Sequence, residues 1–135
     1  MIKLVLCGRP YTKKNTQTID TRGSRPIVLP SKNFERYQND CLKQITGAHR
    51  KNVDFNVLVE VAYYMRDRSG WPDLVGLMQA TADILEKAGV LKNDKFISSW
   101  GRTRIAGLDK QNPRAEIFIM PDPYELHISM KGSGK

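Results

Sequence analysis

The stretch of sequence that decides the fold is residues 71–97, WPDLVGLMQATADILEKAGVLKNDKFI. Asp73 is among the residues preferred at a helix N-cap, and Gly89 is typical of the position just after a helix. Between them, mostly apolar residues recur at helical spacing within one arc: Leu74, Leu77, Met78, Thr81, Ile84, Leu85 and Ala88. The pattern predicts a helix over residues 73–88 that buries this face against a neighbouring element.

Strand-like segments lie on both sides of this helix. Branched residues and alternating patterns predict strands over residues 2–7, 27–29, 55–65, 96–100, 102–106 and 115–120. A second helix is predicted from an N-cap at Ser31 to about Thr46, while 9–26 reads as an irregular loop and 107–113 as a turn. This order predicts an α/β (α+β) fold in which a small mixed β-sheet packs against two main helices.

The length of 135 residues fits one domain, which we expect over residues 1–120, followed by a loosely ordered tail over 121–135. The two cysteines imply neither a disulfide framework nor a zinc site. The apolar opening Ile2–Cys7 is too short for a signal peptide and runs into Gly8, and no apolar run approaches a membrane span. We therefore expect a cytoplasmic protein.

The positive charge is concentrated at one end of the chain. Residues 1–51 hold 11 Lys and Arg against 3 Asp and Glu, a balance of +8, whereas residues 52–135 hold 11 of each, a balance of 0. A one-sided basic surface attracts a polyanion through counterion release. The distribution favours nucleic-acid binding, although a merely soluble basic face has the same composition.

Three aspartates bracket the helix of residues 73–88. Asp73 stands at its start, Asp83 on its exposed face and Asp94 in the turn after it. Converging carboxylates are the usual way for a protein to hold Mg²⁺ against a phosphate. Each residue also has a structural interpretation: Asp73 as an N-cap, Asp94 as a turn residue and Asp83 as a solvated charge.

The same stretch resembles the core motif of the RusA family of Holliday-junction resolvases. The residues that carry the resemblance are Pro72, Asp73, Leu74, Leu77, Ala80, Asp83, Leu85, Gly89, Val90, Asn93, Asp94 and Ile97. The start Gly8-Arg9-Pro10 and the segment Ser31-Lys32-x-Phe34-x-x-Tyr37 are also similar to the family, so the likeness covers roughly residues 1–120. It implies a homodimeric endonuclease, in a bacterial or phage setting, that cuts four-way DNA junctions with Mg²⁺ or Mn²⁺.

The chain departs from the family pattern inside this motif. Val75 stands where the family has a third aspartate, Gly76 where it usually has asparagine and Gln79 where it has lysine. Since Val75, Gln79 and Asp83 are spaced by four, they share one helix face. Gly76 and Glu86 are expected on this exposed side too, opposite the apolar arc. We expect Asp73, Asp83 and Asp94 to hold the metal and Gln79 to orient a water or a phosphate. The alternative is a junction-binding protein on the same fold that cuts poorly or not at all.

Basic residues at the start of the chain are the candidates for DNA binding. They are Lys13, Lys14, Arg22 and Arg25 in the predicted loop, and Lys32 and Arg36 on the exposed side of the first helix. Trp71 is a candidate for stacking on an unpaired base, although a packing role is also open. An RNA-binding accessory protein fits the charge, but no aromatic run of the kind used to bind single-stranded RNA is present.

Overall fold

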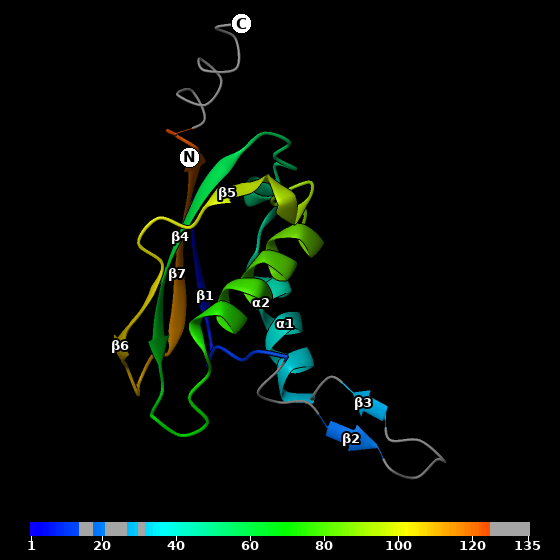
Figure 1. The fold of residues 1–135 in the computed structure, drawn as a ribbon, viewed down its shortest axis with the longest axis vertical. Helices are drawn as coiled ribbons and strands as arrows, with labels where there is room; N and C mark the ends of the chain where they lie inside the picture. Colours follow the sequence, from blue (N-terminus) through cyan, green and yellow to red (C-terminus); the bar gives the residue numbers. More distant parts are fainter. Residues whose placement is uncertain (14–17, 21–26, 30–31, 125–135) are drawn as a thin grey trace, which may run out of the picture.

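A computed structural model describes residues 1–13, 18–20, 27–29 and 32–124 of the chain. The main sheet has five strands, four of them in the order β1-β7-β4-β5 (Figure 1). The fifth strand, β6, pairs with β4 on the same edge as β5 but farther along β4. Its strands are β1 (Ile2–Cys7), β4 (Val57–Met65), β5 (Ile97–Ser99), β6 (Arg104–Leu108) and β7 (Arg114–Pro121). The helices are α1 (Lys32–Gln44) and α2 (Leu74–Lys87), with short 3-10 turns η2 (Gly47–His49) and η3 (Asp94–Phe96).

The sheet is mixed in direction. Strands β1 and β4 pair antiparallel with the central β7, whereas β5 and β6 pair parallel with β4. Every second residue of β1 is buried, as the alternating sequence predicts. In β4 one face is fully buried, whereas the other face is half-buried from Glu60 onward.

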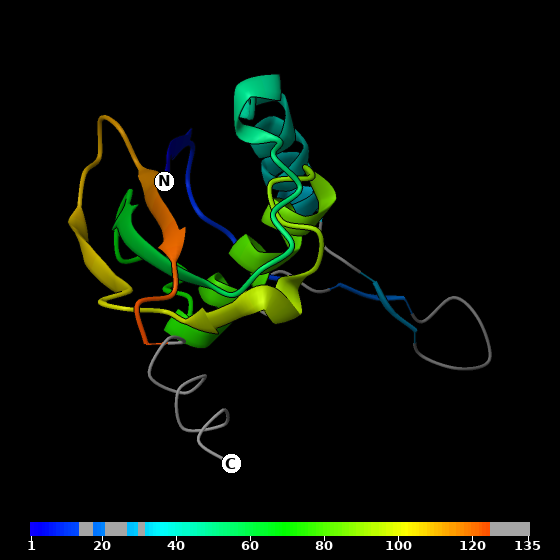
Figure 2. The ribbon, with the colours of Figure 1, turned by 90° about the horizontal axis from the view of Figure 1, so that it is seen from above.

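Both helices lie on the same face of the sheet, as Figure 2 shows from above. The core between the two layers includes Tyr37 and Cys41 from α1, and Leu77, Ile84 and Leu85 from α2. These side chains pack against the buried face of β1, β4 and β7. The α+β class with a mixed sheet and two main helices is therefore confirmed.

The end of α2 follows its predicted signal. Gly89 has a φ of 75°, and the N–H of Val90 donates to the carbonyl of Leu85 at 3.0 Å. A residue in this left-handed region closes the last turn of a helix, and glycine adopts it without steric cost.

The structure corrects three details of the sequence prediction. Thr18–Asp20 forms the strand β2, which pairs with β3 (Ile27–Leu29), although the loop prediction of 9–26 included it. Gly107 and Leu108 belong to β6 and not to the turn. Gly76, which was assigned to the exposed face of α2, is buried. Gly107 and Leu108 pair with β4, and Gly76 packs against Thr12, so these two corrections come from partners far along the chain, whereas β2 pairs with a strand only a few residues later. The N-cap candidate Ser31 lies outside the described residues.

Arg50 joins the C-terminal ends of the two helices. Its guanidinium donates to the carbonyl of Ala88, after α2, at 2.8 Å. It also donates to the carbonyls of Leu42 at 3.0 Å and Ile45 at 3.1 Å, at the end of α1. The last carbonyls of a helix have no partner within the helix and carry partial negative charge. One cation therefore caps both helices.

The two cysteines differ in environment. Cys7 is exposed at the end of β1, whereas Cys41 is fully buried with 0 % exposure. Burial raises the pKa of the Cys41 thiol to about 11, against the opposing effect of a hydrogen bond with Tyr37. The unfolded thiol ionises near its ordinary value of 9.0, so the folded chain keeps a proton that the unfolded chain has lost.

This difference predicts a loss of stability at alkaline pH. We expect the Cys41 thiol alone to lower the free energy of unfolding by about 2 kcal/mol between pH 9 and pH 11, because the unfolded state releases this proton first. Burial also raises the pKa of Tyr37 and of Tyr63, so these two groups add to the fall. Urea unfolding across this range measures the effect. In Cys41→Val the loss should be clearly smaller; an unchanged loss would assign it to other groups.

Among the described residues, neither helix combines the length and the apolar character needed to cross a lipid bilayer.

Candidate nucleic-acid interface

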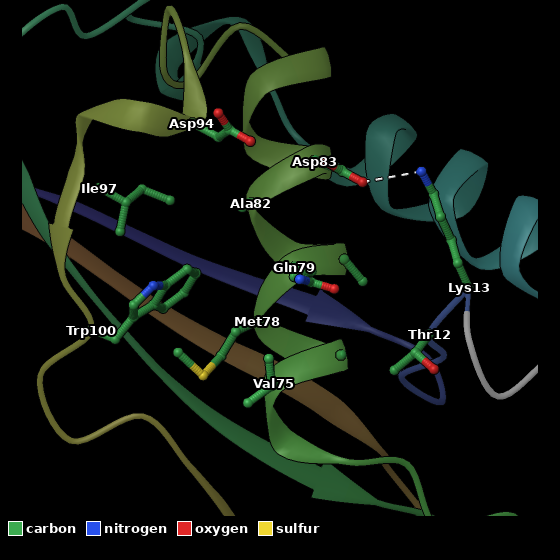
Figure 3. A pocket seen from close by; sticks show the side chains of 12 residues that line it. Thr12, Lys13, Val75, Met78, Gln79, Ala82, Asp83, Asp94, Ile97 and Trp100 are labelled. Carbon is green, nitrogen blue, oxygen red and sulfur yellow. Dashed lines mark ion pairs between the residues drawn. The ribbon is translucent and has the colours of Figure 1, made fainter.

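A cleft of about 810 Å³ runs along the outer face of α2. One wall is the loop after β1, and the other is η3 with β5 and Trp100 (Figure 3). The lining residues are Thr12, Lys13, Val75, Gly76, Met78, Gln79, Ala80, Ala82, Asp83, Asp94, Ile97 and Trp100. Of the residues that carry the predicted resemblance, Ala80, Asp83, Asp94 and Ile97 line the cleft, whereas Leu77, Leu85 and Val90 are buried in the core.

The predicted exposed face of α2 is confirmed in part, since Gly76 is buried and Met78, predicted within the buried arc, lines the cleft. Val75, Gln79 and Asp83 all line the cleft, and Val75 is 61 % exposed. An apolar residue this exposed on a helix contributes little to the core. Val75 therefore forms part of the cleft's surface.

Gly76 lets the loop after β1 approach α2. A Cβ atom built at Gly76 would lie 3.2 Å from Cγ2 of Thr12 and 2.5 Å from Oδ1 of Asp73. Thr12 is itself buried. Glycine at this position is accordingly a packing feature, because a larger side chain would push the loop or the Asp73 carboxylate away.

Lys13 is held against both helices at the edge of the cleft. Its Nζ lies 3.2 Å from Oδ2 of Asp83 on α2, as the dashed line in Figure 3 marks. The same Nζ lies 5.7 Å from the centre of the Phe34 ring on α1, within the range of a cation–π contact. The Asp83 carboxylate is therefore engaged by an ammonium group from the same chain.

Asp94 lies at the opposite end of α2 from Asp73. Its backbone N–H donates to the Glu86 carboxylate at 3.0 Å, in the last turn of the helix. Asn93 caps η3 by accepting from the N–H of Lys95 at 2.9 Å. The Asn-Asp turn thus has a structural role, and the Asp94 side chain faces the cleft (Figure 3).

The structure does not assemble the predicted three-aspartate metal site. Asp73 precedes the 14-residue helix α2 and Asp94 follows it, so the two are separated by about 20 Å of helix axis. Asp73 does not line the cleft, and its side chain makes no capping hydrogen bond. In the described part of the chain, no group of three His, Cys, Asp or Glu side chains is placed to hold a metal ion. The residues of one chain therefore do not fit the implied Mg²⁺ or Mn²⁺ site.

The predicted DNA-binding residues fall into two groups. Lys13, Lys32 and Arg36 are exposed, and the last two flank Phe34 on α1, the residue beneath Lys13. Lys14, Arg22 and Arg25 lie outside the described residues.

Trp71 lies in the loop before α2. It is 42 % exposed, and the Arg68 guanidinium lies 5.9 Å from its ring centre.

Arg9 and Trp100 are two residues of this region whose positions the sequence analysis missed. The Arg9 guanidinium donates to the carbonyl of Ser69 at 2.6 Å and lies 5.2 Å from the ring of Tyr11. This contact ties the loop after β1 to the loop before α2. Trp100 forms the far wall of the cleft (Figure 3). Neither position has a local sequence signal, because both depend on segments far apart in the chain.

No family model matches the chain, and no curated protein sequence matches it.

Proposed function

We propose that this protein binds branched DNA as a RusA-like chain and cuts it weakly or not at all. The observation that carries the proposal is the cleft along α2, which has Lys13 on its edge and Val75 in place of an acidic residue. The excess charge of +8 in residues 1–51, the segment that supplies Lys13, Lys32 and Arg36, supports a polyanionic partner.

In this proposal Lys13, Lys32 and Arg36 contact phosphates. Such contacts position the DNA without reading its sequence, which suits a ligand defined by shape. Trp71 would contact an unpaired base where strands cross, since aromatic stacking tolerates any base. A homodimer with two such surfaces would match the two-fold symmetry of a four-way junction.

The second candidate is a metal-dependent endonuclease that resolves Holliday junctions. It is favoured by Asp83, Asp94 and Gln79, which line one cleft. Because Asp73 lies at the other end of α2, its carboxylate would have to come from a second copy of the chain. Restored cutting when Asp73→Asn and Asp94→Asn proteins are mixed would support this candidate.

The deciding experiment is a junction assay with the full chain. A synthetic four-way junction and a duplex of equal length are each titrated with protein, and cutting is then assayed with Mg²⁺ or Mn²⁺. We expect the junction to bind at least about 10-fold more tightly, a difference of about 1.4 kcal/mol, with no cutting above the protein-free control. Equal affinity for both DNAs would contradict junction binding. Metal-dependent nicking that Asp94→Asn abolishes would favour the endonuclease, and sedimentation would report the dimer.

A further inference from the structure

Asp83 forms an ion pair with a lysine of the same chain. Its carboxylate pairs with Lys13 at 3.2 Å, with the Lys13 side chain 50 % and the Asp83 side chain 33 % exposed. Phe34 is buried and supplies the second surface against which the ammonium lies. Gly76 allows Thr12, the neighbour of Lys13, to pack on α2. Three contacts from two helices therefore hold residues 12 and 13 at the cleft.

We infer that Asp83 is a positioning residue that orients the Lys13 ammonium toward a DNA phosphate. This inference rests on the proposed DNA-binding function and deepens it by assigning one side chain of the cleft. A free lysine side chain samples many rotamers, and fixing it beforehand removes part of the cost of ordering it on binding. The phosphate and Asp83 can share the ammonium, which has three donors.

Asp83 and Asp94, the two aspartates of the cleft, are expected to affect DNA binding in opposite directions. Asp94 lines the same surface, but it has no ion-pair partner within the described residues. An unpaired carboxylate facing DNA repels the phosphates, so its neutralisation strengthens binding. Neutralising Asp83 should have the opposite effect, because it releases Lys13.

A measurement without DNA tests the positioning itself. Acetylation of lysine amines by a limiting amount of acylating reagent is followed at each site by mass spectrometry, in the folded wild type and in Asp83→Asn. We expect the Lys13 amine to react several-fold faster in Asp83→Asn, with Lys110, far from the cleft, unchanged. Thermal unfolding of both proteins shows that they are folded. An unchanged Lys13 rate would overturn the inference.

A double-mutant cycle on junction DNA tests the consequence. We expect Asp83→Asn to weaken binding about threefold and Lys13→Met about 10-fold, with the slope of log affinity against log salt reduced by about 1 in Lys13→Met. In the Lys13→Met background, Asp83→Asn should cause no further loss. Asp94→Asn should leave affinity equal or higher. Tighter binding by Asp83→Asn, or additive losses, would overturn the inference.

Titration with Mn²⁺ alone tests whether Asp83 binds a metal ion and does not position Lys13. If wild type binds Mn²⁺ and Asp83→Asn does not, Asp83 is a metal ligand and the inference is wrong. If wild type binds no branched DNA, the proposed function fails, while the acetylation rates still decide whether Asp83 holds Lys13.

Discussion

Arg50→Met is expected to lower the free energy of unfolding by about 3 kcal/mol. The substitution removes hydrogen bonds to the carbonyls of Ala88, Leu42 and Ile45, and keeps most of the apolar stem. A hydrogen bond to a charged group contributes about 1.5–3 kcal/mol, and partial exposure reduces each bond here to about 1 kcal/mol. Loss of the positive charge also removes its interaction with the dipoles of both helices.

Urea unfolding measures this change, and neighbouring variants control it. Lys51→Met removes a cation from the next position, which is exposed, and should change stability by less than about 0.5 kcal/mol. Arg50→Lys should recover only part of the loss, because one ammonium cannot span three carbonyls as the guanidinium does. A loss no larger than that of Lys51→Met would show that Arg50 does not stabilise the helix ends.

The double substitution Lys13→Glu with Arg36→Glu is expected to weaken junction binding about 100-fold at low salt. Both residues are exposed, on the edge of the cleft and on the adjacent α1. Reversing each charge removes an attraction to phosphate and adds a repulsion. The loss should shrink as the salt concentration rises, because salt screens exposed charges.

A control variant reverses two positive charges on the other side of the molecule, so that the effect of their position is distinguished from the effect of the net charge. Arg104 and Lys110 are exposed and lie on or after β6, at the far edge of the sheet from α1 (Figure 1). Arg104→Glu with Lys110→Glu changes the net charge by the same amount and should cost less than about fivefold. Equal losses in the two double variants would mean that the cleft is not the DNA-binding surface.

Local patterns were sufficient to predict most of the secondary structure. The alternation in β1 and the N-cap and glycine signals around α2 are set by neighbours within a few residues, so they are readable from the chain. The strand Thr18–Asp20 was missed because its partner, Ile27–Leu29, is what makes it a strand.

The candidate site was predictable only in part. The spacing of Val75, Gln79 and Asp83 correctly placed them on one exposed face. Spacing alone did not exclude a shared metal site for Asp73 and Asp94, because it does not reveal which end of α2 the segment after the helix packs against.

By itself the sequence determined most of the helices and strands, most of the buried face of α2 and the one-sided positive charge, because each depends on the order of residues along a short segment. Only the tertiary structure decided which distant side chains meet: Lys13 with Asp83, Thr12 with Gly76 and Arg50 with the ends of both helices. Those contacts arise when the core brings together segments that are far apart in sequence, and no local pattern specifies them.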